Sequence, residues 1–227
     1  MKILISAGEA SGDLYAAELV TALRRRFPEA EFLGCTGPRM RAAGVRTVVD
    51  AADLSVLGLA EVLVHIPRIY GEFRRLTAAC RRERPAVAIL TDSPDFHLRL
   101  ARRIAGNVPT FQLVAPQAWA WRAGRVRQMR RHLRGVLCIF PFEEPFFRSH
   151  GVPAWYIGHP LTRIVRASLS KHEFFRKHAI DGSRPLITML PGSRVGEVAR
   201  HLATFQAAGE QLGRRAHLIL ATPAGFS

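Results

Sequence analysis

The chain has 227 residues, of which 48% are hydrophobic and 22% charged, so it is long enough to bury a core as one large domain or two small ones. This composition excludes a disordered chain. Lys and Arg total 33 against 18 Asp and Glu, and the net charge of +15 favours polyanionic partners such as phosphorylated substrates, anionic lipid surfaces or nucleic acid. No apolar run approaches the roughly 20 residues of a membrane-spanning helix, so we expect any membrane contact to be peripheral.

Many of the positive charges are arginines in alanine-rich runs, as in residues 24–26, 81–84 and 130–134. Runs of this kind are usually solvated helix faces. Charge alone therefore does not choose among the polyanionic partners, although the chain lacks any recognised nucleic-acid-binding motif and we expect no nucleic-acid partner.

The three cysteines, Cys35, Cys80 and Cys138, lie far apart and form no Cys-x-x-Cys pair. Their spacing predicts neither a zinc site nor a disulfide framework, and it fits a reducing cytoplasm. The apolar run after Met1 stops at Gly8, which is too short for the core of a signal peptide. We therefore expect a cytoplasmic protein.

Short apolar runs rich in β-branched residues alternate with amphipathic stretches, which is typical of βαβ units in a parallel sheet with helices on both faces. The fold class predicted is α/β. Seven strands are expected in a first domain that spans residues 1–160, and a charged linker is expected over residues 161–184. The predicted strands are residues 2–6, 31–35, 45–49, 87–91, 110–114, 136–139 and 154–157.

A second α/β unit begins after the expected linker, with strands at residues 186–190 and 217–222 and a helix at residues 194–212. One βαβ unit cannot cover both faces of its own sheet. We therefore expect residues 185–227 to be the incomplete start of a second domain, in a chain that ends early.

The first predicted strand runs into a loop of small residues that opens a helix. Such loops let a ligand approach backbone amides at a helix N-terminus. The spacing of Gly8 and Gly12 matches neither the dinucleotide fingerprint nor a Walker A loop, and an ordinary tight turn with a Ser or Asp cap is the alternative. Glu9 is the stronger candidate, because a carboxylate at the carboxyl end of a strand faces the crevice in which open α/β sheets bind ligands.

Two carboxylates follow the fourth predicted strand, Asp92 and Asp95, with Pro94 between them. A carboxylate in this position could act as general base for a hydroxyl nucleophile, while the alternative is that it caps the next helix. We expect Asp95 to be the cap and Asp92 to be exposed in the cleft. His97 is expected to be a satisfied structural histidine.

Two tryptophans, Trp119 and Trp121, precede Arg122 after the fifth predicted strand. They could stack on a sugar face, but the residues alone favour a plug at the edge of the core. Glu143, after the sixth strand, is either another cleft carboxylate or an acid favoured by the helix dipole.

The segment from Leu190 to Glu197 combines a strand, a Pro-Gly turn and a helix start. Ser193 at the expected N-cap and Arg194 in the first turn would place a guanidinium fork beside a positive dipole end, which suits a diphosphate. The alternative is a capped helix with Arg194 facing solvent.

Residues 54–70 are unusually apolar for a connection. They fit an interfacial element beside a basic surface. A core helix is the alternative, since Pro67 obscures the periodicity. The apolar side chains concerned are Val62, Leu63, Ile66, Ile69 and Tyr70.

Taken together, these segments resemble the lipid-A-disaccharide synthases. This family transfers a diacylglucosaminyl unit from UDP-2,3-diacylglucosamine to 2,3-diacylglucosamine 1-phosphate, and releases the lipid A disaccharide 1-phosphate and UDP. The match consists of seven ordered motifs, Gly8-Glu9-Ala10-Ser11-Gly12-Asp13, Gly37-Pro38-Arg39-Met40, Asp92-Ser93-Pro94-Asp95-Phe96, Trp119-Ala120-Trp121-Arg122, Pro141-Phe142-Glu143, Gly158-His159-Pro160-Leu161 and Leu190-Pro191-Gly192-Ser193-Arg194.

The resemblance implies a GT-B architecture of two Rossmann-like domains, inversion at the anomeric carbon and no metal or other cofactor. It places the catalytic base at Asp92 and the diphosphate-binding residue at Arg194, with Glu9 as a further catalytic candidate. Other residues expected to contact the substrates are Gly8, Ser11, Gly12, Asp13, Asp95, Trp121, Arg122, Glu143, Gly192, Ser193 and Glu197.

The resemblance also favours the interfacial interpretation of residues 54–70, on the anionic inner face of the inner membrane of a Gram-negative bacterium. Partners expected are the two acylated sugars and either a second copy of the chain or a C-terminal half supplied in trans. One departure is His97, where the family commonly has Asn. The alternatives are a truncated non-catalytic or split-enzyme subunit that binds acyl-sugar phosphate or membrane, and a UDP-sugar 2-epimerase-like enzyme.

Overall fold

The computed structural model describes the backbone of residues 1–54, 59–121, 124–193 and 195–222, and the side chains of all of these except residues 59–65, 195 and 214. The chain forms two compact units, Met1–Ile164 and Val165–Ser227. The segment expected to be a linker contributes to both, because it contains the short helices α7 (Leu161–Ile164) and α8 (Lys171–Lys177).

The first unit contains a parallel sheet of seven strands in the order β3-β2-β1-β4-β5-β6-β7. The prediction of these strands is confirmed, with each end displaced by at most one residue. The strands are β1 (Lys2–Ala7), β2 (Glu31–Thr36), β3 (Arg46–Asp50), β4 (Val87–Thr91), β5 (Thr110–Leu113), β6 (Gly135–Cys138) and β7 (Ala154–Tyr156).

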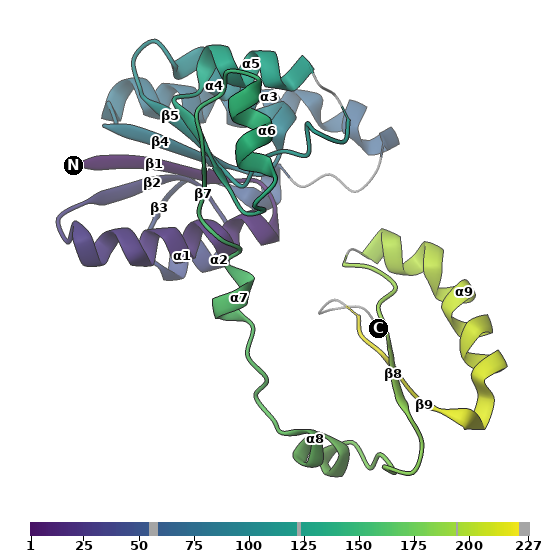
Figure 1. Cartoon of the computed structure of the whole chain (residues 1–227). Coiled ribbons are helices and arrows are strands. Elements are labelled where there is room, and N and C mark those ends of the chain that lie inside the picture. Colours follow the sequence, from purple (N-terminus) through teal and green to yellow (C-terminus); the bar gives the residue numbers. More distant parts are fainter. Residues whose placement is uncertain (55–58, 122–123, 194, 223–227) are drawn as a thin grey trace. The chain divides into compact units, whose positions relative to one another are not determined.

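Helices cover both faces of this sheet (Figure 1). One face carries α1 (Ala10–Arg26) and α2 (Pro38–Ala42), and the other carries α3 (Leu59–Glu83), α4 (Pro94–Ile104), α5 (Gly124–His132) and α6 (Glu143–Ser149); the one-turn helix η1 (Ala51–Asp53) follows β3. Because both faces are buried, neighbouring residues of one strand serve two cores. Ile3 and Ile5 pack toward α1, whereas Leu4 packs in the cluster that includes Leu100 of α4.

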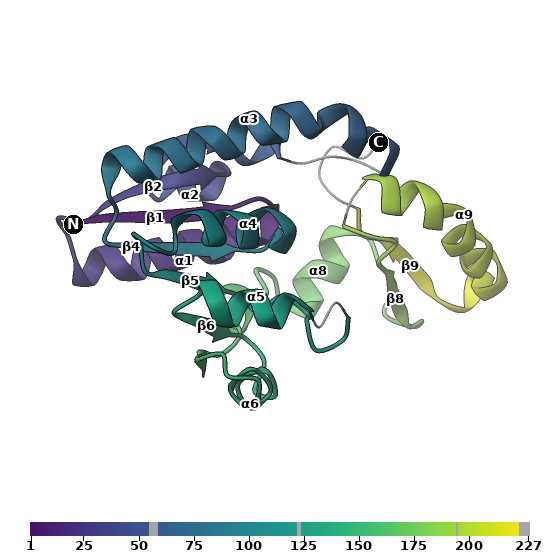
Figure 2. The ribbon, with the colours of Figure 1, turned by 90° about the horizontal axis from the view of Figure 1, so that it is seen from above.

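The helix α3 runs without interruption through Pro67 (Figure 2). A proline inside a helix removes one backbone hydrogen bond and normally breaks or kinks it. Here the helix continues to Glu83, and its second half buries Leu76, Ala79 and Cys80 in the core. The packing of that half stabilises a helix that local propensity alone would interrupt.

The second unit has a parallel pair of strands, β8 (Leu186–Met189) and β9 (His217–Leu220), joined by α9 (Val195–Leu212) and the one-turn helix η2 (Gly213–Arg215). The predicted strand–helix–strand order is confirmed. Ser170 and Glu173 form a reciprocal capping box that starts α8. Leu218 and Leu220 of β9 are more than one-third exposed.

None of the helices in the described ranges combines the length and the apolar character that crossing a membrane would require. The three cysteines are buried and unpaired, and burial raises the pKa of the Cys80 thiol to about 11.

Candidate functional site

The carboxyl ends of β1 and β4 lie side by side at the point where the strand order reverses. Ligands of open α/β sheets bind at such switch points. Gly8 and Glu9 leave β1 here, and Asp92 and Ser93 leave β4. The Asp92 carboxylate accepts hydrogen bonds from the Gly8 amide at 2.8 Å and from the Glu9 amide at 3.0 Å. One side chain therefore ties the two strand ends together.

The glycines of the first loop make room for Asp92. A Cβ atom at Gly12 would overlap Oδ2 of Asp92, and one at Gly8 would overlap Oγ of Ser93. The backbone amides of Gly8 and Glu9, in the loop predicted to bind a ligand, thus already donate to a carboxylate of the chain itself. Ser11 is exposed in the first turn of α1.

Asp92 and Ser93 have left-handed backbone conformations, with φ of 55° and 35°. Such conformations are strained in residues other than glycine and depend on the surrounding structure. His97 supplies part of that support, because its Nδ1 lies 2.9 Å from the Asp92 carbonyl oxygen and its Nε2 lies 2.8 Å from Oγ of Ser6. A carbonyl only accepts, so Nδ1 carries the proton and Nε2 accepts from the Ser6 hydroxyl.

His97 is fully buried, and burial lowers its pKa to about 4, so the ring is neutral near pH 7. The prediction of a satisfied structural histidine is confirmed. Because its ring also binds the backbone carbonyl of Asp92, His97 supports the candidate site as well.

Burial raises the pKa of the Asp92 carboxyl to about 7, and the hydrogen bonds from Gly8, Ser93 and Glu9 only partly oppose this. The expectation that Asp92 is exposed is wrong, because its side chain is only 14% exposed. Burial is what brings its pKa close to neutrality, the range in which a general base is most effective.

Asp13 is 2% exposed and accepts three backbone hydrogen bonds, from Gly37 at 2.9 Å, Arg39 at 2.9 Å and Met40 at 3.0 Å. Both of its oxygens are therefore used to hold the start of α2 against α1. The sequence places Asp13 beside Glu9, but the structure places its carboxylate in the protein interior.

Asp95 lies in the first turn of α4, and Ser93 occupies the N-cap position, so the prediction that Asp95 is the cap is wrong. Its carboxylate forms an ion pair of 2.9 Å with Arg125 of α5, and the guanidinium of Arg125 lies 5.1 Å from the centre of the Trp121 ring. Arg125 was not predicted from the sequence. The only signal in the sequence is that a basic residue follows Trp121 by four positions, since arginine commonly lies over tryptophan rings.

The tryptophans are not core residues. Trp119 is 40% exposed and Trp121 is 55% exposed, so the prediction that they plug the core is wrong. Trp119 makes an edge-to-face contact with Phe142. The next residue, Glu143, is buried in the first turn of α6 and accepts from the amides of Ile139 and Phe140, and burial raises its pKa.

A cavity of about 680 Å³ opens beside the Asp92 turn and brings several predicted residues together. Its lining combines polar residues such as Glu9, Ser93 and Asp95 with apolar ones such as Ile69 and Phe73. The lining residues are Glu9, Leu54, Ile66, Ile69, Tyr70, Phe73, Ser93, Pro94, Asp95, Phe96, Arg99, Trp121 and Arg125. Arg122 and the side chains of Val62 and Leu63 lie outside the described residues.

In the second unit, the turn after β8 is held by Glu197 of α9. Its carboxylate accepts from the Ser193 amide at 2.9 Å and lies 3.3 Å from the Ser193 hydroxyl. Gly192 has a φ of 153°, and a Cβ at this position would collide with the Glu197 side chain. Arg194 lies outside the described residues.

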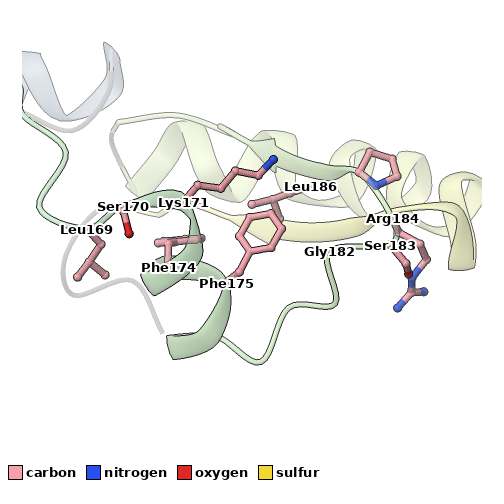
Figure 3. Close-up of a pocket in the computed structure, with 10 residues that line it drawn as sticks. Leu169, Ser170, Lys171, Phe174, Phe175, Gly182, Ser183, Arg184 and Leu186 are labelled. Atoms are coloured by element: carbon pink, nitrogen blue, oxygen red, sulfur yellow. The ribbon is translucent and has the colours of Figure 1, made fainter.

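A further cavity of the second unit, of about 580 Å³, lies between α8 and the start of β8 (Figure 3). Phe174, Phe175, Lys171 and Leu186 line it, with Lys171 over the Phe175 ring at 5.4 Å. It adjoins the amino end of β8, whereas open α/β sheets bind ligands at the carboxyl ends. The switch point of the first unit is therefore the better candidate. The described residues contain no group of three or more His, Cys, Asp or Glu side chains arranged to hold a metal ion.

The sequence matches the family model described as lipid-A-disaccharide synthetase over residues 3–221. The chain belongs to this family. It is 63% identical to a lipid-A-disaccharide synthase of Solibacter usitatus over 98% of the chain and 59% of the relative, and 46% identical to one of Koribacter versatilis over 94% of the chain and 56% of the relative. The chain thus spans a little more than half of the length of the curated relatives that it matches.

Solved structures agree on the architecture of this family member. It resembles a Listeria monocytogenes protein described as a UDP-N-acetylglucosamine 2-epimerase, with a TM-score of 0.63 and 13% identity over 99% of the chain and 70% of that protein. It also resembles the calicheamicin glycosyltransferase CalG4, with a TM-score of 0.57 and 16% identity over 97% of the chain and 64% of that protein. At these identities the likeness establishes the fold, which is that of the GT-B glycosyltransferases.

Proposed function

We propose that this chain carries the acceptor side of a lipid-A-disaccharide synthase. The reaction joins the diacylglucosaminyl unit of UDP-2,3-diacylglucosamine to the 6-hydroxyl of 2,3-diacylglucosamine 1-phosphate. The observation that carries the proposal is a buried carboxylate at the switch point, Asp92, with a pKa of about 7 and an apolar cavity beside it. Family membership supports the choice of substrates.

Asp92 acts as the general base. With a pKa of about 7, a large share of the carboxyl groups is ionised at neutral pH and can remove the proton of the acceptor hydroxyl. The hydroxyl oxygen then forms a bond to the anomeric carbon, the bond from that carbon to UDP breaks, and the configuration inverts. Gly8, Gly12 and His97 hold the base in place rather than touch the substrate.

The donor diphosphate binds at the turn after β8, which contains Gly192, Ser193 and Arg194. The charge that develops on the leaving UDP is neutralised by the Arg194 guanidinium. Glu197 fixes the shape of this turn through the Ser193 amide. Asp13 and Glu143 are buried and hold neighbouring turns, so they contribute as positioning residues.

The polar lining of the acceptor cavity positions the sugar. Glu9 and Ser93, which are neighbours of Asp92 at the two strand ends, line the cavity, and Trp121, held over Arg125, offers an aromatic face for the sugar ring. Arg122 adds a positive charge for the acceptor phosphate. The apolar lining, which includes Ile69, Phe73 and Phe96, takes an acyl chain.

The acceptor reaches this cavity from a membrane. Ile66 is 49% exposed and Tyr70 is 61% exposed on α3, beside the cavity that both residues line. They form an exposed apolar face of the kind that amphipathic helices insert at the boundary of a bilayer. Val62 and Leu63 precede them in the sequence of α3. We place this face on the inner leaflet, at the cytoplasmic side of the inner membrane.

The test is an assay of this polypeptide with both acylated sugars, alone and after addition of the remaining part of the second domain of the Solibacter usitatus relative. Formation of the disaccharide 1-phosphate in either mixture supports the proposal, and formation only after addition identifies a split arrangement. Absence of disaccharide in both mixtures, with both polypeptides folded, contradicts it. Conversion of the UDP-sugar into its 2-epimer would instead indicate an epimerase.

A further inference from the structure

Helices α3 and α4 of the first unit pack against each other (Figure 2). Side chains of both helices line a basic groove with a volume of about 870 Å³. Five arginines line it, two from α3 and three from α4, and we call it the arginine groove. Its lining residues are Tyr70, Phe73, Arg74, Thr77, Ala78, Arg81, Arg99, Arg102 and Arg103.

No carboxylate is among the lining residues, although α3 itself contains three glutamates, Glu61, Glu72 and Glu83. The side chain of Glu61 lies outside the described residues. Glu72 pairs with Arg75, and Glu83 pairs with Lys2, Arg46 and Arg82, none of which lines the groove. Within the described part of the chain, the five groove arginines form no ion pair with a carboxylate. All five side chains are exposed, so the described part of the groove presents positive charge to solvent.

The arginine groove continues into the apolar cavity of the candidate site. Tyr70, Phe73 and Arg99 line both spaces. Exposed Ile66 and Tyr70 lie on the same helix. A ligand that fits both features has an anionic head and apolar chains. A nucleic acid would satisfy the charges but would leave the apolar side chains in contact with its polar backbone.

We propose that the arginine groove binds the phosphate of an anionic phospholipid, whose acyl chains lie against Ile66 and Tyr70. Guanidinium groups form paired hydrogen bonds with phosphate oxygens, and several phosphates of one leaflet can occupy the groove because five such groups line it. The site would hold the mouth of the acceptor cavity at the lipid surface. The proposal rests on the proposed membrane location and not on the transfer reaction.

The experiment is cosedimentation of the 227-residue chain with vesicles of phosphatidylcholine, with and without about 30% phosphatidylglycerol, at physiological salt. The groove variant is Arg81→Gln/Arg102→Gln/Arg103→Gln. The matched control is Arg25→Gln/Arg26→Gln/Arg134→Gln, which removes the same charge from exposed positions that do not line the groove. A second groove variant with Lys at the same three positions retains the charge. Circular dichroism checks folding, and no sugar substrate is present, so failure here is distinct from failure of the proposed reaction.

We expect the unmodified chain to prefer the anionic vesicles. The groove variant should lose on the order of 100-fold in this affinity, since each basic residue at a lipid surface contributes about 1 kcal/mol. The control should lose much less, and the Lys variant should keep most of the affinity. Equal losses in the groove variant and the control, or equal binding to both vesicle types, would overturn the proposal. So would a loss confined to binding of a DNA duplex, with vesicle binding intact.

Discussion

The carboxylate of Asp92 occupies the space that a side chain at Gly12 would fill. Gly12 lies in the first turn of α1, and Asp92 follows β4, so two segments about 80 residues apart meet at a contact that only glycine allows. The same carboxylate binds the amides of Gly8 and Glu9. The geometry of the proposed base therefore depends on the size of residue 12.

Substitution of Gly12 by Ala should displace Asp92 and lower the rate of disaccharide formation by at least about 100-fold, because small displacements of a catalytic group cost about that much. We also expect a loss of about 1 to 3 kcal/mol in the free energy of unfolding, as for other overpacked sites. Urea unfolding and steady-state kinetics measure the two effects.

The matched control for this substitution is Gly106→Ala, because a Cβ at Gly106 meets no atom within 4 Å. It should leave the rate unchanged within about twofold. Equal effects of the two substitutions would show that Asp92 does not depend on the space at Gly12.

The rate should follow the ionisation of Asp92. Since the pKa of Asp92 is raised to about 7 by burial, kcat/KM should rise about tenfold per pH unit below pH 7 and level off above it. Asp92→Asn should lower the rate by about 100- to 10,000-fold and remove this limb from the pH profile. If Asp92→Asn retains the rise of kcat/KM below pH 7, a group other than Asp92 is responsible for this rise.

Stability should show the opposite trend with pH. A carboxyl whose pKa is raised in the folded state favours the protonated form, so its contribution is fully present below about pH 4 and is lost as the pH rises to about 7. Relative to Asp92→Asn, the free energy of unfolding of the unmodified chain should fall by on the order of 3 kcal/mol between pH 4 and pH 8.

The comparison between the two proteins separates the effect of Asp92 on stability from that of His97, whose pH dependence has the opposite sign. The pKa of His97 is lowered to about 4, so its neutral buried ring costs stability as the pH falls from about 6.5 to 4 in both proteins. Chemical denaturation at four or five pH values is sufficient. A constant difference between the two proteins across this range would contradict the raised pKa of the Asp92 carboxyl.

His97 offers a test of positioning. His97→Leu removes both hydrogen bonds of the ring and leaves the Ser6 hydroxyl and the Asp92 carbonyl buried without it, at a cost of about 1 to 3 kcal/mol for each group. His97→Asn retains a donor for the carbonyl and should lose less stability and less activity.

The kinetic signature separates positioning from simple destabilisation. If His97 supports the Asp92 turn, His97→Leu should shift the pH at which kcat/KM levels off, whereas His97→Asn should shift it less. If both variants keep the pH profile of kcat/KM of the unmodified protein, His97 stabilises the core without positioning Asp92.

The strands of both units follow from the sequence because each is a short apolar run between polar or glycine-rich segments. In the first unit, helices cover both faces of the sheet, and its strands are therefore apolar along most of their length. The switch point follows as well, since Glu9 and Asp92 each come directly after such a run. The sequence does not show which side chains of distant segments contact one another. The glycine loop predicts a place for an anion, but not that the anion is Asp92 itself.

Burial explains the other differences between expectation and structure. Asp13 and Glu143 are acidic residues in the first turns of α1 and α6, where exposure is the ordinary expectation, yet backbone amides satisfy both in the interior. Trp119 and Trp121 are apolar residues that the protein leaves exposed. Arg125 pairs with Asp95 only because α4 and α5 pack together, a contact that local sequence does not specify.

The apolar lining of the acceptor cavity predicts a chain-length effect. Ile69 lines this cavity, and Ile69→Phe should fill part of it. Each methylene of an acyl chain that is no longer buried costs about 0.8 kcal/mol, so exclusion of two or three methylenes should raise the KM for a long-chain acceptor by about 10- to 100-fold. The KM for an acceptor with chains shorter by four carbons should change much less. Val165→Phe, at a residue 64% exposed, is the control for added bulk. Equal changes in KM for the long-chain and short-chain acceptors would place the acyl chain outside this cavity, because only a chain that reaches Ile69 can sense the lost volume.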